Sequence, residues 1–260
     1  MEEYTEGLVS VIMPSYKTAR FIGESIESVI AQIYSNWELI IVDDCSTDNT
    51  DIVVASYKDD RIRYLKNDNN SGAAVSRNLA LREAKGEWIA FLDSDDLWMP
   101  EKLEKQIAFM KENNYKFSAT YCKYIDEESN DLHEVDLCPR HITRFKNYLY
   151  NWIASQTVMY HAPSIGVIQV ADLKKRNDYA IWLKALKKSD CWCLPEVLSQ
   201  YRVRGKSISH DNFWKLVKSH YTLFHDGEGM NAFISIVLTC CNMLFGLIRK
   251  ILYVRRTREE

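Results

Sequence analysis

The sequence predicts an α/β fold with a mostly parallel central sheet flanked by helices. Apolar segments alternate with amphipathic segments along the first half of the 260-residue chain. Two of the apolar segments, residues 39–42 and 88–92, are rich in β-branched or aromatic residues and end in aspartates. Because strands that alternate with helices indicate βαβ units, we expect successive strands to be parallel.

Each expected element follows from a local pattern. Apolar runs closed by turn-forming residues predict strands at residues 8–13, 39–42, 62–65, 88–92 and 117–123. Apolar residues three and four positions apart predict a helix from residue 22 and further helices at residues 47–57, 73–84, 101–111, 144–150 and 178–187. Residues 126–139 are polar and poorly patterned, so we expect a loop there.

The composition excludes several classes of protein. With 47% hydrophobic and 27% charged residues the chain is globular, and a net charge of −3 gives no reason to expect a nucleic-acid partner. The seven cysteines show neither a CxxC pair nor zinc spacing, which favours reduced thiols in a cytoplasm. The first six residues lack an apolar run, so we expect no signal peptide and a cytosolic location.

Carboxylates follow two of the predicted strands. Asp43 and Asp44 come after residues 39–42, and Asp93, Asp95 and Asp96 come after residues 88–92. Ligands of open α/β sheets bind outside the carboxyl ends of the strands. Gathered carboxylates repel one another unless a cation offsets their charge, and oxygen ligands suit Mg²⁺ or Mn²⁺. The pattern therefore predicts a metal site for a phosphorylated substrate.

Four motifs in this order resemble the family 2 glycosyltransferases, which are inverting enzymes of the GT-A fold. The motifs lie at residues 10–16, 40–48, 70–72 with 77–78, and 93–96, and the resemblance covers about residues 9–209. It implies a GT-A catalytic domain over residues 1–212, with a donor half at about 8–123 and an acceptor half at about 124–212. Residues 213–260 would form a helical, membrane-associating tail.

The resemblance assigns roles to the second carboxylate group. Asp95 would be the metal ligand, Asp93 would lie by the ribose and sugar of the donor, and Asp96 would assist. Ser94, in the same loop, is counted with the donor-binding residues. The alternative is that Ser94 and Asp96 only cap the helix that follows.

The first two motifs would hold the nucleotide. Asp43 and Asp44 would face it, one of them accepting a hydrogen bond from uracil. Pro14, Ser15 and Tyr16 would line the base pocket, with Tyr16 stacked on the base. The alternatives are a capping and turn cluster at residues 44–48 and a rim position for Tyr16.

Three arginines are expected near the donor diphosphate. Arg77 would grip a phosphate through two hydrogen bonds, or else pair with one of the aspartates. Gly72 permits a close backbone approach or a left-handed turn. Arg202 and Arg204 alternate on an extended segment and so point the same way. With residues 207–209 they resemble the family segment that folds over the donor phosphates, although a solvated edge is equally compatible with the sequence.

The resemblance also supplies a general base. An inverting transfer needs a group that removes the proton of the acceptor hydroxyl. Asn177 and Asp178 match the Asn-Asp form of the family motif, and Asp178 is the expected base. The alternative is that Asp178 is an ordinary helix N-cap.

The C-terminal segment has the length of a membrane span. Residues 229–248 carry no charge over twenty positions. A polar stripe divides the predicted helix, which favours an in-plane or docked amphipathic helix over a span: Asn231, Ser235, Thr239, Asn242 and Gly246. The basic residues near or after its end would meet anionic lipid head groups: Arg249, Lys250, Arg255, Arg256 and Arg258. A helix packed on the domain or on a second copy in a homodimer is the alternative.

The likeness is to bacterial glycosyltransferases of O-antigen, capsule and teichuronic-type polysaccharides, and above all to enterobacterial β-1,3-glucosyltransferases. It implies transfer of a hexose, with glucose through a β-1,3 linkage as the best guess, from a UDP-sugar. The acceptor would be a polyprenyl-diphosphate-linked N-acetylhexosamine at the cytoplasmic face of the inner membrane. Mn²⁺ is favoured over Mg²⁺, and the acceptor pocket is expected in residues 126–166.

Two rival functions stay open. A sugar-phosphate nucleotidyltransferase also uses metal and nucleotide, but no glycine-rich phosphate loop lies near the N-terminus. A membrane-docked scaffold without activity would have no need of Asp178 beside Asp95. A dinucleotide dehydrogenase is disfavoured, since no GxGxxG follows any predicted strand.

Overall fold

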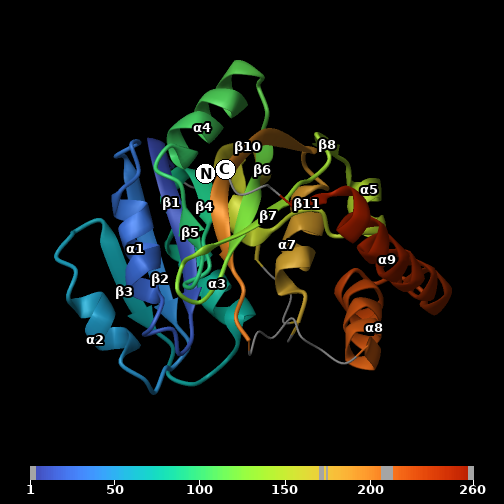
Figure 1. Ribbon diagram of the computed structural model, residues 1–260, viewed down its shortest axis with the longest axis horizontal. Helices are drawn as coiled ribbons and strands as arrows, with labels where there is room; N and C mark the ends of the chain where they lie inside the picture. Colours follow the sequence, from blue (N-terminus) through green and yellow to red (C-terminus); the bar gives the residue numbers. More distant parts are fainter. Residues whose placement is uncertain (1–3, 170–172, 174, 206–212, 257–260) are drawn as a thin grey trace.

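The first half of the chain forms a parallel sheet in the computed structural model (Figure 1), which describes residues 4–169, 173, 175–205 and 213–256. Neighbouring strands in the order β3-β2-β1-β4 are all parallel. Their bounds are Thr5–Ser15 for β1, Trp37–Asp43 for β2, Ile62–Lys66 for β3 and Gly86–Phe91 for β4. The connecting helices are α1 (Ile22–Ile30), α2 (Thr50–Ala55) and α3 (Ala73–Glu83). The expected βαβ units are confirmed.

The second half extends this sheet with strands of both directions. β9 (Met159–His161) is antiparallel to β4 and to β6 (Phe117–Ile125), whereas β10 (Cys191–Arg202) is parallel to β6. The short strands β5 (Leu97–Trp98) and β8 (His141–Ile142) are antiparallel to β10. The α/β class with flanking helices is confirmed, and the sheet is parallel from β3 to β4 and mixed beyond.

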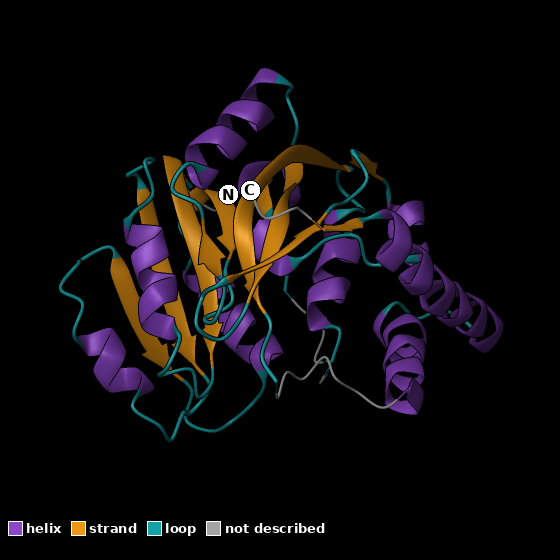
Figure 2. Ribbon diagram, in the orientation of Figure 1, coloured by secondary structure: helices purple, strands orange, loops and turns teal. Residues whose placement is uncertain are grey.

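Further helices accompany these strands. They are α4 (Lys102–Glu112), α5 (Arg144–Leu149), α6 (Ala162–Ile165), α7 (Asn177–Ala185) and the 3-10 turn η1 (Ser155–Thr157). Helices cover both faces of the sheet (Figure 2).

The expectation of a loop over residues 126–139 was wrong in part. This stretch contains β7 (Asp131–Asp136), which lies between β6 and β11 (Val254–Arg256) and is antiparallel to both. Its residues are half-buried or exposed and half of them are acidic, so no apolar pattern marks it. Backbone pairing with two neighbouring strands forms this strand, and the partner β11 comes from the far end of the chain.

Apolar side chains are buried on both faces of the parallel strands because they alternate along each strand. Ile12 and Ile40 belong to the core that includes α3 and α7, and Val11 and Leu39 belong to the core that includes α1 and α4. A sheet buried on both faces leaves its edges for ligands. The carboxyl edge of β1, β2 and β4 is therefore where binding side chains gather.

The C-terminal region consists of α8 (Phe213–Thr222), a π-helical turn η2 (Leu223–Gly227) and α9 (Ala232–Leu252). Figure 1 shows α8 and α9 on the far side of the molecule from β3. The polar stripe of α9 faces the protein: Ser235, Thr239 and Asn242 are buried. Apart from Lys250 near its end, its exposed residues are apolar and include Phe233, Ile236, Leu244, Leu247 and Ile251. The helix is thus amphipathic in the inverse sense, with its apolar side outward.

Candidate active site

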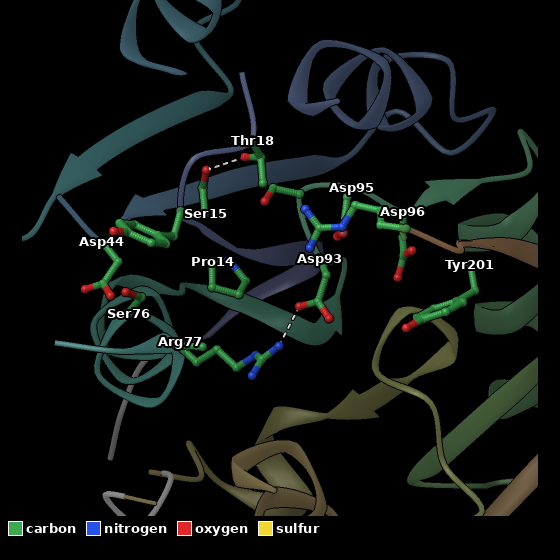
Figure 3. Close-up of a pocket in the computed structure, with 14 residues that line it drawn as sticks. Pro14, Ser15, Thr18, Asp44, Ser76, Arg77, Asp93, Asp95, Asp96 and Tyr201 are labelled. Atoms are coloured by element: carbon green, nitrogen blue, oxygen red, sulfur yellow. Dashed lines mark hydrogen bonds and ion pairs between the residues drawn. The ribbon is translucent and has the colours of Figure 1, made fainter. Parts of the chain in front are cut away.

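The carboxyl ends of β1, β2 and β4 border a cavity of about 250 Å³, called here the first cavity (Figure 3). The register places Ser15 of β1 beside Asp43 of β2, so the loops after these strands start at one level. The predicted residues that line the cavity are Pro14, Ser15, Tyr16, Asp44, Arg77, Asp93, Ser94, Asp95, Asp96 and Arg204. Asp43, Gly72, Arg202 and Asp178 are not among its lining residues.

The two aspartates after β2 have different surroundings. Asp43 is fully buried and accepts hydrogen bonds from Ser46 and from the Tyr64 hydroxyl at 2.9 Å, so it holds the turn after the strand. Asp44 reaches the cavity wall, and its carboxylate accepts the backbone N–H of Ser71 at 2.8 Å and of Gly72 at 2.7 Å. Asp44 therefore fixes the loop that leads into α3, and within residues 44–48 the turn-cluster reading holds for Ser46, which donates to Asp43, and for Asp48, which accepts from Thr50.

Gly72 sits in this loop with φ 90°, a conformation that residues with a side chain rarely adopt. Among the described residues, no atom lies within 4 Å of where its Cβ would be, so the glycine is required by backbone conformation and not by crowding. It starts α3 at the cavity wall, where Ala73 is a lining residue.

Arg77 connects three parts of the site. Its guanidinium is buried and pairs with Asp93 at 2.5 Å through Nη2, while Nη1 donates to Asn177 Oδ1. Burial lowers the pKa of Arg77, but the charges of Asp93 and Asp178 raise it by more, so the guanidinium stays charged. Both of the sequence readings, a phosphate grip and an ion pair, are compatible with this placement.

The loop after β4 holds carboxylates that are costly to ionise. Burial raises the pKa of Asp95, Arg204 opposes this with an ion pair at 2.9 Å, and the charge of Asp93 adds to it. Burial raises the pKa of Asp96 well above its usual value, and the charges of Asp95 and Asp93 add to this. Asp96 accepts the backbone N–H of Arg202 at 2.9 Å.

These residues fit a divalent cation. Raised pKa values mean that the buried carboxylates lack sufficient positive charge around them, which a cation would supply. Within the described residues, no three His, Cys, Asp or Glu side chains are grouped to enclose a metal. Mg²⁺ sites that handle phosphates commonly use one or two carboxylates and take the other ligands from substrate and water. Asp95 and Asp93 could hold an ion in this shared way.

Arg202 is not placed to bind a ligand. Its side chain is fully buried and donates to the backbone oxygen of Asp95 at 2.8 Å and to Ser129 Oγ at 2.8 Å, and it pairs with Glu24 at 2.9 Å. These contacts fasten the end of β10 to the carboxylate loop. Arg204 lines the first cavity instead, and residues 207–209 lie outside the described residues.

Asp178 lies in a second cavity of about 390 Å³. Asp93 and Tyr201 line both cavities, so the two meet at these side chains. The N-cap of α7 is Arg176, in a left-handed conformation with φ 62°, and Asp178 lies inside the first turn. Asp178 is therefore not the N-cap, and its carboxyl belongs to the wall of a cavity that adjoins the first one.

Of the side chains that line the second cavity, sequence reasoning assigned a site role by name only to Asp93 and Asp178. Its lining includes residues 150–156, within the region expected to hold the acceptor pocket, together with Tyr124, Asp136 and Arg249. Arg249 was expected to face lipid, but it pairs with Asp136. One feature of the sequence could have indicated this position: Arg249 follows the last residue of the polar stripe by three positions, and the stripe is the side of α9 that faces the protein.

The fold is that of the GT-A glycosyltransferases. The solved structure of S. aureus TarS 1-349 in complex with UDP-GlcNAc aligns with a TM-score of 0.69 over 89% of this chain and 70% of that chain. The two sequences are 22% identical, so this likeness shows the fold alone.

Sequence comparison gives the family. The model for glycosyl transferase family 2 matches residues 10–174, and the chain belongs to that family. Two Escherichia coli relatives, WfgD and WfaP, share the description UDP-Glc:alpha-D-GlcNAc-diphosphoundecaprenol beta-1,3-glucosyltransferase. WfgD is 39% identical over 83% of this chain and 84% of its own length. WfaP is 35% identical over 97% of this chain and 99% of its own length, a match that includes the C-terminal helix. The resemblance inferred from the motifs is confirmed.

Proposed function

We propose that this protein is an inverting, metal-dependent glycosyltransferase that moves a hexose from a UDP-sugar to a polyprenyl-diphosphate-linked N-acetylhexosamine. The observation that carries the proposal is the meeting of the two cavities at Asp93. One cavity gathers a guanidinium and carboxylates suited to a nucleotide diphosphate, and the other contains Asp178. The names of WfgD and WfaP favour glucose and a β-1,3 linkage in surface polysaccharide assembly.

The donor would occupy the first cavity. The base would bind against Pro14, Ser15 and Tyr16. Asp44 would position the cavity wall, because its carboxylate accepts a hydrogen bond from the backbone N–H of Gly72. Arg77 and Arg204 would face the diphosphate, because both guanidinium groups line the cavity and are always charged. Arg204 would exchange its contact with Asp95 for one with phosphate when a cation is present.

Asp95, with Asp93, would hold the cation, with Mn²⁺ favoured over Mg²⁺. When bound, the cation would offset the negative charge that grows on the leaving diphosphate. Asp93 keeps its place through Arg77, so the loop is positioned before any ligand arrives.

Asp178 would act as the general base. A hydroxyl oxygen of the acceptor forms a bond to C1 of the sugar, its proton passes to the Asp178 carboxylate, and the bond between C1 and the diphosphate breaks with its electrons on UDP. A single displacement of this kind inverts the configuration at C1. The arrangement suits it, since Asp178 and the donor cavity lie on either side of Asp93.

The outer face of α9 would rest on the cytoplasmic surface of the inner membrane, as the membrane-associating part of residues 213–260. Of the helices in the described part of the chain, α9 has the length and composition to cross a bilayer, yet its polar stripe is buried against the protein. A helix whose polar side packs on the protein and whose apolar side is exposed fits a position in the plane of the membrane surface. Lys250, Arg255 and Arg256 are exposed near its end and would meet lipid head groups, whereas Arg258 lies outside the described residues.

The test is the release of UDP from a panel of UDP-sugars, with and without Mn²⁺ and a synthetic N-acetylhexosamine-diphosphate-lipid. We expect acceptor-dependent release with one sugar, lost on chelation and retained by the Asp51→Asn control, which changes an exposed carboxylate on α2. Pyrophosphate release from UTP and a sugar phosphate would support a nucleotidyltransferase instead. Full function of Asp178→Asn in cells would support a scaffold.

A further inference from the structure

The second cavity contains a cation that the proposed chemistry does not use. Arg249 lies in the last turn of α9 and lines the cavity together with Asp178 and Asp93. It reaches the cavity from a helix whose opposite face is apolar and exposed. Figure 1 shows the end of α9 leading directly into β11 beside β7.

Neighbouring side chains fix the position of this guanidinium. Nη2 of Arg249 donates to Asp136 Oδ2 in β7 and to the Tyr124 hydroxyl at 3.3 Å, and the group lies 5.9 Å from the ring centre of Tyr150. Burial lowers the pKa of Arg249, but the charge of Asp136 together with the contributions of Tyr150 and Tyr124 gives a net rise, so the group remains charged.

Part of the guanidinium is left for a ligand. Both hydrogen bonds that Arg249 donates to the described residues use Nη2, whereas the group carries five N–H donors. The side chain is 19% exposed and borders the cavity, and neither Nε nor Nη1 donates one of its two hydrogen bonds to the described residues. A fixed guanidinium with free donors is suited to phosphate oxygens, which it can bind through two parallel hydrogen bonds.

The chemistry of a lipid-linked acceptor matches this arrangement. Its reacting hydroxyl must lie by Asp178, at the end of the cavity that meets the first cavity at Asp93. The diphosphate is attached on another side of the same sugar and continues into the lipid. Arg249 stands on the helix whose outer side suits a bilayer, so the path from hydroxyl to lipid runs from Asp178 toward α9.

We propose that Arg249 binds the diphosphate of the acceptor through the N–H groups that Asp136 does not use. This inference rests on the proposed function, and it makes α9 part of the acceptor site as well as the contact with lipid. Arg249 is then a residue that selects diphosphate-linked acceptors over glycosides of the same sugar.

The test compares two acceptors with the same sugar, an alkyl N-acetylhexosamine diphosphate and the alkyl glycoside without phosphates. Arg249→Met should raise KM for the diphosphate acceptor by about 10- to 100-fold, the effect of losing charge-assisted hydrogen bonds, and leave KM for the glycoside within about twofold. Alkyl diphosphate without sugar should compete with the acceptor in the native protein and lose potency by a similar factor in the variant.

The matched control is Arg256→Met, which removes another arginine pair between the C-terminal segment and β7, at Glu134, outside both cavities. It should change neither KM. If Arg249→Met does not fold, Arg249→Lys serves instead, because it keeps a cation beside Asp136 but lacks the planar set of donors. It should also raise KM for the diphosphate acceptor and not for the glycoside, by a smaller factor.

Equal loss with both acceptors, or no loss with either, would overturn the inference and leave Arg249 as a structural tie of α9 to β7. That outcome leaves the proposed function standing, because the native protein still transfers hexose. Absence of transfer by the native protein to either acceptor would overturn both.

Discussion

Arg77 of α3 and Asp93 after β4 form a 2.5 Å ion pair at the junction of the two cavities. The same guanidinium donates to Asn177, the residue before Asp178. One buried cation thus joins the carboxylate loop to the helix that carries the proposed base. Donor binding and base placement are expected to depend on it together.

Arg77→Lys should lower kcat/KM by about 100-fold. A lysine keeps the charge but cannot serve Asp93 and Asn177 at once, and each charge-assisted hydrogen bond contributes about 1.5–3 kcal/mol. Steady-state kinetics and calorimetric titration with UDP measure the effect. The control is Arg82→Lys, an exposed position on the same helix, and equal activity of the two variants would refute the role of Arg77.

Asp95→Asn should remove the response to Mn²⁺ without destabilising the metal-free protein. Because burial raises the pKa of Asp95 in the fold, its charged form opposes folding above its ordinary pKa, and a neutral amide removes that opposition. Loss of the cation should slow transfer by on the order of 1,000-fold, equivalent to several kcal/mol. Thermal melting with and without Mn²⁺ measures the first effect. A variant that is still stabilised by Mn²⁺ as strongly as the native protein would exclude Asp95 as a ligand.

Asp178→Asn should slow transfer by about 100- to 10,000-fold while UDP-sugar binding is unchanged, because a general base acts on the acceptor and not on the donor. Single-turnover kinetics and donor titration separate these two quantities. Asp190→Asn, beyond the end of α7 and outside both cavities, is the control. Weakened donor binding in Asp178→Asn would argue for a role in the first cavity.

Acid should destabilise the packing of α8. Burial lowers the pKa of His220 to about 3, and the charge of Arg176 adds to this, whereas an unfolded histidine titrates near 6.5. The fold therefore favours the neutral ring of His220. The contribution of this neutral ring to the free energy of unfolding is complete above about pH 6.5 and is lost as pH falls toward 3. Urea midpoints at pH 7 and pH 5 should differ less in His220→Gln than in the native protein. The control is His225→Gln, at a half-buried position that pairs with Asp226; it should keep the native difference, and the same behaviour in both variants would contradict the assignment.

The outward face of α9 should determine binding to lipid. Phe233 and Leu247 are 77% and 64% exposed, and their replacement by serine removes apolar area worth about 1.5–3 kcal/mol for each fully buried side chain. Sedimentation with anionic vesicles should show binding at least 10-fold weaker. Ile52→Ser, at a 66% exposed position on α2, is the control. Unchanged vesicle binding, or concentration-dependent dimerisation lost in the double variant, would assign this face to another copy of the chain.

The elements that bury apolar residues could be predicted from sequence. The apolar run of β2 ends in Asp43 and that of β4 is followed two residues later by Asp93, so both the sheet and its functional edge are visible in the pattern. β7 could not be predicted, because its charged residues are ordered by pairing with β11, about 120 residues later in the chain.

The first cavity could also be predicted, whereas side-chain partners could not. Arg202 and Arg204 are equivalent in the sequence. In the structure the buried side chain of Arg202 binds Ser129 and Glu24, whereas Arg204 lines the first cavity. Alternation fixes the face of a strand but not the depth of burial. In the second cavity Arg249 pairs with Asp136 from a distant segment, so the local pattern of α9 could not identify the partner.

The central claim is a single displacement at C1 of the donor sugar, with the acceptor and the donor in the two cavities that meet at Asp93. The most direct test is the configuration at C1 in the product. UDP-glucose, in which the sugar is α-linked, would be incubated with the N-acetylhexosamine-diphosphate-lipid, and the new linkage would be determined by proton NMR. The account predicts a β-linked disaccharide, formed at least about 100-fold more slowly by Asp178→Asn than by the native protein. An α-linked product would contradict it, because retention requires a mechanism in which Asp178 is not the base for a single inversion.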